Sequence, residues 1–117
     1  MRHQVKNTRI NRNSAQLKAL IRSLSTALIV SGTIETTKVK AKVTASAVDK
    51  MIARTKGKDK MNAIRYLKKH LYGEDASKII LDELHDKYKD RQSGFTRIVK
   101  LGARPGDGAE KVVLQLV

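Results

Sequence analysis

The 117-residue sequence contains no cysteine and no tryptophan, and only one proline, one phenylalanine and three tyrosines. Without cysteine, the chain forms no disulfide and offers no thiolate to a metal ion. Proteins that stack the bases of a single strand on a sheet need several exposed aromatic side chains, so that mode of binding is disfavoured. The core must come mainly from Leu, Ile, Val and Ala, and a chain of this length is expected to fold as one domain.

Long apolar runs are also missing from the sequence. The longest clear run is ALIV at residues 27–30, whereas a helix that crosses a bilayer needs about 20 apolar residues. The first residues, MRHQVKNTR, are basic but lack both the apolar segment of a secretory signal and the apolar helical face of an organellar transit peptide. We therefore expect no membrane partner and disfavour an organellar address.

Acidic residues are scarce in the first two thirds of the chain. Residues 1–72 carry 17 Lys and Arg against three acids, a net charge of +14, whereas residues 73–117 carry eight of each sign. Each cation that meets a phosphate releases condensed counterions, so an excess of this size predicts a polyanionic partner. Solubility alone is served by a net charge of a few units.

The first twelve residues differ from the rest of the chain. They hold four cations and no acid, with Val5 and Ile10 as bulky apolar residues. Such a segment cannot form a core of its own. We predict a basic extended arm over residues 1–12, mobile in the free protein, followed by a single domain over residues 13–117.

The spacing of apolar residues predicts the first half of that domain. An amphipathic helix begins at Asn13 with a capping-box-like Gln16 and ends at Gly32. The β-branched run TIETT, residues 33–37, predicts a strand whose last threonines cap a second helix. The apolar stripe of the second helix is formed by Val39, Val43, Ala47, Val48, Met51 and Ile52. A basic loop, TKGKDK, is expected at residues 55–60.

The second half continues with two helices and two strands. Met61, Ile64, Leu67 and Leu71 indicate a third helix, and Ala76, Ile80, Leu84 and Tyr88 indicate a fourth that begins near residue 74. The runs FTRIVKLG and KVVLQLV have the length and composition of strands. The order α-β-α-α-α-β-β therefore predicts an α+β fold with a small three-stranded sheet packed against helices.

The glycine-rich segment GFTRIVKLGARPGDGA, residues 94–109, has two readings. A phosphate-binding loop needs a Lys followed by Ser or Thr after its last glycine, and then a helix. Here Gly108 is followed by AEKVV, which is typical of a strand, and Pro105-Gly106 suits the middle of a type II turn. We predict a hairpin that turns at residues 104–108 and buries Val112, Leu114 and Leu116.

Candidate catalytic and metal-binding groups are weak in this sequence. His3, His70 and His85 show no metal-ligand spacing and are expected at the surface. The acids Asp82, Glu83 and Asp86 fit the solvated face of a helix better than acid–base catalysis. We therefore expect no catalytic residues, no cofactor, no metal and no small-molecule substrate.

The remaining possibility is that a basic arm, basic helices and a hairpin recognise the phosphate backbone and the shape of a nucleic acid. Lys38, Lys40 and Lys42 crowd the first turns of the second helix, where the helix dipole disfavours each cation by ~0.3–1 kcal/mol. This placement predicts an anion opposite them. Charge alone adds Lys6, Arg9, Arg22 and Lys38 to the candidate contacts.

Several motifs together resemble one family. MRH at the start, NRN at residues 11–13, IETTKVKAK at 34–42 and GFTRIVKLGARPGDGA at 94–109 are similar, in this order, to the seventeenth protein of the bacterial large ribosomal subunit. The resemblance implies an rRNA-binding structural protein, beside small ribosomal proteins in the cytoplasmic large subunit. It implies RNA contacts at Arg2, His3, Asn11, Arg12, Asn13, Lys40, Lys42, Arg97, Lys100 and Arg104. Residues 57–92 match the family weakly, so contacts there rest on charge alone.

Two other functions compete with this one. A nucleoid-type or regulatory DNA-binding protein would show the same charge, and relative affinity for duplex DNA and rRNA at equal salt separates the two. A nucleotide-dependent enzyme built on the glycine segment would bind ATP or GTP.

Overall fold

A computed structural model describes residues 12–117 of the chain. The elements are α1 (Ser14–Ser31), β1 (Thr33–Thr37), α2 (Lys38–Lys56), α3 (Lys60–His70), α4 (Asp75–Ile79), the π-helical segment η1 (Ile80–Leu84), α5 (His85–Lys87), β2 (Thr96–Ala103) and β3 (Glu110–Leu116). Because α4, η1 and α5 follow one another without a break, the predicted α+β order is confirmed. The predicted mobile arm lies outside the described residues, apart from Arg12.

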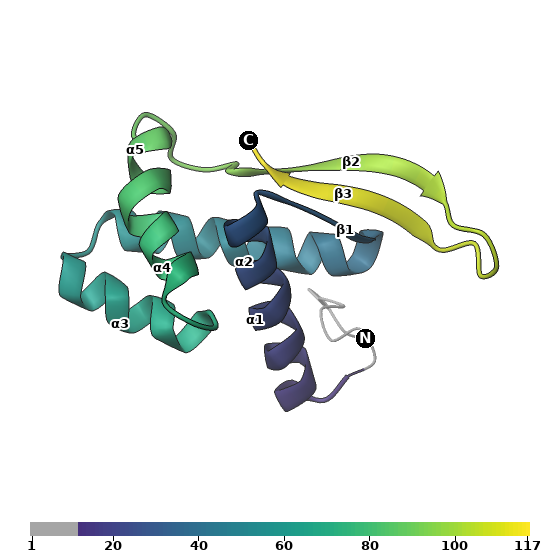
Figure 1. Ribbon diagram of the computed structural model, residues 1–117, viewed down its shortest axis with the longest axis horizontal. Coiled ribbons are helices and arrows are strands. Elements are labelled where there is room, and N and C mark those ends of the chain that lie inside the picture. The colour runs from purple at the N-terminus through teal and green to yellow at the C-terminus, as the bar shows by residue number, and fades with distance from the viewer. Residues whose placement is uncertain (1–11) are drawn as a thin grey trace, which may run out of the picture.

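The sheet is antiparallel, with the strand order β1-β3-β2. Leu114 of β3 pairs with Ile34 of β1 on one side and with Ile98 of β2 on the other, so these three side chains share the inner face. A register shift between Lys100 and Gly102 marks a bulge in β2. Figure 1 shows the sheet along one side of α2, with the β2–β3 hairpin extending past one end of that helix and α3 to α5 gathered at the other.

The predicted hairpin is confirmed. The Arg104 N–H donates to the Ala109 carbonyl at 2.8 Å, and the Gly108 N–H donates to the Arg104 carbonyl at 3.2 Å. Gly106 has φ 101°, the left-handed region that the second central position of a type II turn requires. Val112 and Leu114 are fully buried and Leu116 is partly buried against the core. A strand, and not a helix, follows Gly108, which removes the phosphate-loop reading.

The core lies between the inner face of the sheet and the helices. Its fully buried members include Leu28 of α1, Ile52 of α2, Leu67 of α3 and Phe95 just before β2. The ring of Phe95 lies 5.1 Å from the ring of Tyr88, and the Tyr88 hydroxyl donates to the Val117 carbonyl at 2.8 Å. Two of the chain's four aromatic residues therefore join the end of α5 to the base of the hairpin.

Most predicted helix ends agree with the structure. The Asn13 side chain accepts a hydrogen bond from the Gln16 N–H at 2.9 Å, and Gly32, at φ 83°, ends α1. Thr37 is the N-cap residue of α2, as predicted, but its side chain makes no capping hydrogen bond. The predicted loop at 55–60 was too long, because α2 continues to Lys56 and Asp59 caps α3 by accepting from the Asn62 N–H.

The fourth helix contains a π-helical turn that its sequence explains. Its buried apolar residues, Ala76, Ile80, Leu84 and Tyr88, are spaced by four throughout. An α-helix has 3.6 residues per turn, so a spacing of four drifts around the axis by about 40° at each step. The wider η1 turn (Ile80–Leu84) corrects part of this drift and keeps all four side chains on the core.

Two residues assigned to apolar stripes lie at the surface. Val39 is 52% exposed and Met61 is 58% exposed. The buried face of α2 follows Ala41, Thr44 and Val48 instead, which places Val39 on another side of the helix. The contacts of α2 with the sheet, and not hydrophobicity alone, select this face.

Candidate nucleic-acid interface

A groove of about 700 Å³ lies between α1, α2 and α3. Its floor is apolar, and its rim carries five cations and no acid. The lining residues are Leu17, Lys18, Ile21, Arg22, Val43, Ser46, Ala47, Lys50, Met51, Arg54, Tyr66, Lys69 and His70. We call this surface the basic groove. Its charge and its hollow shape suit a polyanion.

Helical spacing places the cations of the basic groove side by side. Lys18 and Arg22 on α1 are four residues apart, as are Lys50 and Arg54 on α2, so each pair shares one face of its helix. Lys18, Lys50, Arg54 and Lys69 are exposed, and none makes an ion pair within residues 12–117. A cation without a carboxylate partner keeps its full charge for a phosphate.

Arg22, a predicted RNA contact, has bonds inside the protein. Its guanidinium donates to the carbonyls of Leu71 at 3.0 Å and Lys68 at 3.4 Å, and it lies 4.3 Å from the centre of the Tyr72 ring. These contacts bind α1 to the C-terminal end of α3, where free carbonyls attract a cation. Arg22 therefore has a structural role in the wall of the basic groove, and its contact with RNA stays a prediction.

The three lysines at the start of α2 have different environments in the structure. Lys38 forms an ion pair with Glu110 at 3.3 Å, so part of the predicted anion opposite this cluster belongs to the chain itself. Lys42 is exposed. Lys40 lines a separate hollow of about 450 Å³ with Arg104 of the hairpin, which brings two predicted contact residues together.

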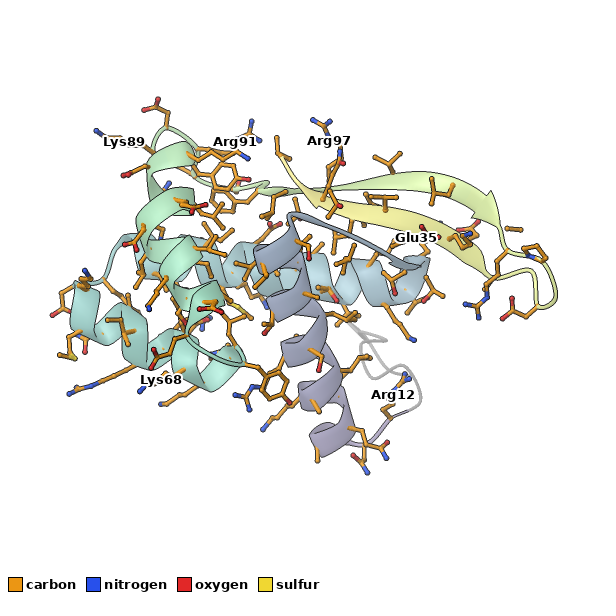
Figure 2. The ribbon with its side chains drawn as sticks, in the orientation of Figure 1. Arg12, Glu35, Lys68, Lys89, Arg91 and Arg97 are labelled. Atoms are coloured by element: carbon orange, nitrogen blue, oxygen red, sulfur yellow. The ribbon has the colours of Figure 1, made fainter. Side chains whose placement is uncertain are left out.

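The cations of the hairpin lie apart from the basic groove. Arg97 pairs in register with Gln115 on the outer face of the sheet, and Figure 2 shows its side chain pointing away from the helices. Lys100, beside the bulge, is exposed. The Nε of Arg104 donates to the Asp107 carboxylate at 2.8 Å, and this carboxylate also accepts from the Ala109 N–H at 3.1 Å. The bound guanidinium lowers the pKa of Asp107 well below its usual range.

The remaining predicted contacts lie at the N-terminus. Arg2, His3, Lys6, Arg9 and Asn11 lie outside the described residues. Arg12 precedes the cap of α1, and the side chain of Asn13 is the cap. The structure thus gives Asn13 a local folding role that accounts for its position.

Lys18, Lys50, Arg54 and Lys69 were not among the contacts predicted from the sequence. The sequence does indicate that each of them is exposed, because cations that recur every four residues on an amphipathic helix mark its solvated face. What was missing was the crossing of three helices, which turns three separate basic faces into one groove.

Two histidines expected at the surface are partly buried and bonded. The Nε2 of His85 lies 2.9 Å from the hydroxyl of Thr55, and that hydroxyl also contacts the Met51 carbonyl at 2.8 Å. Burial and the nearby Lys56 ammonium lower the pKa of His85. The Nδ1 of His70 donates to the Tyr66 carbonyl at 2.9 Å. The His85 imidazole therefore joins α5 to α2, whereas the His70 imidazole bonds within α3.

One carboxylate has an unusual environment. Burial raises the pKa of Asp49, while hydrogen bonds from Thr96 and from the Phe95 backbone act in the opposite direction. The Thr96 hydroxyl donates to this carboxylate at 3.2 Å, which joins α2 to β2. Asp82, Glu83 and Asp86 are exposed, as expected of a solvated face. The described residues contain no group of three or more His, Asp or Glu that could hold a metal ion.

The described residues thus form a small, basic α+β domain with a groove that no acidic residue lines. None of the helices in residues 12–117 is long and apolar enough to span a membrane. The family model described as "Ribosomal protein L17" matches residues 20–117. The chain belongs to the ribosomal protein L17 family.

Curated relatives agree with this assignment. A protein of Staphylococcus epidermidis named "Large ribosomal subunit protein bL17" is 42% identical over 118 residues, which cover 93% of this chain and 97% of the relative. Proteins with the same name from Gemmatimonas aurantiaca and Salinibacter ruber are 39% and 40% identical over 117 residues, the whole of this chain. The matched part is 98% of the Gemmatimonas protein and 59% of the Salinibacter protein.

Proposed function

We propose that this protein is a structural constituent of the large ribosomal subunit and binds rRNA there, in the bacterial cytoplasm. The observation that carries the proposal is the basic groove, whose rim has five cations and no acid. Family membership and the names of the bacterial relatives support the ribosomal setting. The proposal assigns the chain no catalysis and no cofactor.

The binding mode is phosphate-backbone and shape recognition. Three helices present cations to one groove, and the predicted arm adds Arg2, Lys6, Arg9 and Arg12. If ~8 of the cations of residues 1–72 meet phosphates, the slope of log affinity against log salt is about −6 to −7. A fourfold rise in salt then weakens binding by about 10⁴-fold. Neighbouring small ribosomal proteins are the other expected partners.

The first experiment is fractionation of native ribosomes on a sucrose gradient with detection of this protein. We expect it in the large-subunit fraction, and its absence there would contradict the proposal. In a second experiment, purified protein binds large-subunit rRNA and a duplex DNA of matched phosphate number at equal salt. Tighter binding to rRNA supports the proposal, whereas equal or tighter binding to DNA favours a nucleoid or regulatory role.

A further inference from the structure

The floor of the basic groove is apolar although its rim is charged. Leu17, Ile21, Val43 and Ala47 are partly buried there, and Met51 is buried beneath them. Phosphate binding alone needs only cations on an open surface, so it leaves the hollow and its apolar floor unexplained. A volume of about 700 Å³ is in the ~300–1,000 Å³ range of pockets that hold a small organic group.

Two stacked rings stand at one side of this hollow. The rings of Tyr66 and His70 lie 4.4 Å apart with an angle of 27° between their planes, and both residues line the groove. Because a carbonyl oxygen only accepts, His70 uses its Nδ1 proton on the Tyr66 carbonyl, which leaves Nε2 available for another partner. The Lys58 ammonium also lies 4.4 Å from the centre of the Tyr66 ring, so the ring surface left for a partner is that of His70. The groove thus combines this surface with an apolar floor, a hydrogen-bonding nitrogen and cations.

We infer that the basic groove receives one unstacked nucleotide of the RNA. The base lies on the floor formed by Leu17, Val43 and Ala47, beside the stacked rings, and the flanking phosphates meet Lys18, Lys50 and Lys69. Recognition of RNA by unstacked bases uses this combination of aromatic or apolar contact with backbone charge. The inference rests on the proposed function and adds a base-binding site to it.

Charge decides between RNA and an acidic protein segment as the occupant. Five cations line a hollow of about 700 Å³, and RNA brings one phosphate on each side of every base. A peptide of similar length needs an acidic residue at almost every position to match that charge density. The rings and the apolar floor also match the flat face of a base better than the branched chain of an aspartate or glutamate.

The test uses the wild-type protein and three probes of similar length and charge. These are hexaadenylate, a hexamer of the stable abasic tetrahydrofuran spacer with the same phosphates, and hexaglutamate. Methyl-detected NMR at saturating hexaadenylate is expected to show transfer from base protons to the methyl groups of Leu17 and Val43. Val99 and Leu101, 41% and 51% exposed on the hairpin, serve as exposed methyl groups outside the groove.

Affinities of the same probes complete the test. Hexaadenylate is expected to bind at least about tenfold more tightly than the abasic hexamer, because one base is stacked. Equal affinities, or magnetisation transfer no stronger at Leu17 and Val43 than at Val99, would overturn the inference. Hexaglutamate that competes as well as hexaadenylate would also overturn it and assign the groove to an acidic protein segment.

A pair of variants of α2 tests the base site independently. Ser46→Leu fills the groove without changing charge, whereas Ala53→Leu adds the same side chain at an exposed position that does not line the groove. We expect Ser46→Leu alone to remove the preference for hexaadenylate over the abasic hexamer, with the salt slope unchanged. If wild-type protein binds rRNA but shows no such preference, the base site is wrong and the proposed function stands. If it binds neither rRNA nor the hexamers, both fail.

Discussion

The basic groove and the β2–β3 hairpin both carry cations, but only in the hairpin are some of these cations paired with carboxylates. All three ion pairs found in residues 12–117 involve a hairpin residue: Lys38 with Glu110, Arg104 with Asp107, and Lys111 with Glu35. In the basic groove, Lys18, Lys50, Arg54 and Lys69 have no carboxylate partner within the same residues. The two surfaces therefore differ in the charge that they offer to a partner.

This difference in ion pairing suggests that the groove serves RNA binding and that the hairpin base serves the stability of the fold. A cation already paired with a carboxylate gains less from a phosphate, because the carboxylate must be displaced or must remain nearby. The hairpin also supplies two fully buried core residues, Val112 and Leu114, and Phe95 stands at its base. We expect changes in the groove to weaken RNA binding and changes at the hairpin base to weaken the fold.

The largest expected effect is on stability, from Phe95→Ala. Phe95 is fully buried against Tyr88, and truncation of a buried phenylalanine costs about 3–5 kcal/mol of unfolding free energy. Denaturant unfolding followed by circular dichroism measures this loss. Val99→Ala, at an exposed position of β2, is the control and is expected to change stability by less than about 0.5 kcal/mol. A loss for Phe95→Ala as small as that expected for Val99→Ala would show that the hairpin base is not part of the core.

The next effect is on RNA binding, from the triple variant Lys18→Gln, Lys50→Gln and Lys69→Gln. Removing three phosphate contacts should flatten the salt slope by about 2–3 units and weaken binding at 0.1 M salt by about 10²–10³-fold. A salt titration of binding to a large-subunit rRNA fragment measures both quantities. The thermal stability of the variant is expected to stay unchanged, because the three side chains are exposed and make no ion pair among the described residues.

A matched triple variant tests whether position or net charge matters. Lys78→Gln, Lys87→Gln and Lys89→Gln removes the same charge from exposed positions on and after the fourth helix. We expect its salt slope to remain within about 0.5 units of the wild-type value, because these lysines stand among eight acids in residues 73–117. Equal losses in the two triple variants would refute the special role of the groove.

The sequence alone predicts much of the fold for local reasons. Gly32 and Gly106 adopt the left-handed conformations that their turns require, and the alternation of Val112, Leu114 and Leu116 sets the buried face of β3. The exposure of Val39 was not predictable in this way, because it depends on which face of α2 meets the sheet.

The candidate site was harder to predict than the fold. Net charge located it in the first two thirds of the chain, but the basic groove exists only where α1, α2 and α3 cross. The bonds of Arg22 to the Leu71 and Lys68 carbonyls join residues more than 40 positions apart, which no local pattern reports. The pairing of Arg104 with Asp107, three residues away, was within reach of sequence reasoning.

A smaller effect is expected from Asp107→Asn at the tip of the hairpin. In the wild-type protein the guanidinium of Arg104 donates to the Asp107 carboxylate, and the change removes this charged partner. If the tip meets phosphate as predicted for Arg104, the salt slope should steepen by about 0.7–0.9 units. The double variant Arg104→Gln and Asp107→Asn is expected to lose this gain. If Asp107→Asn has the same salt slope as the wild-type protein, the tip of the hairpin does not touch phosphate.

The smallest expected effect concerns pH and the junction between α2 and α5. Burial and the Lys56 ammonium lower the pKa of His85 below its ordinary value of 6.5, whereas Asp86 acts in the opposite direction. Between the two pKa values the unfolded chain binds more protons than the folded chain, so stability rises with pH through this window and falls on acidification below 6.5.

Unfolding free energies at pH 7.5 and pH 5.5 measure this contribution for wild type and for His85→Gln. We expect the wild-type protein to lose more stability on acidification than the variant does. The difference should stay below about 1 kcal/mol, because His85 is only partly buried and solvent screens its charge. An identical loss in both proteins would mean that His85 titrates alike in the folded and unfolded chains. In that case the bond between His85 and the Thr55 hydroxyl makes no pH-dependent contribution to the attachment of α5 to α2.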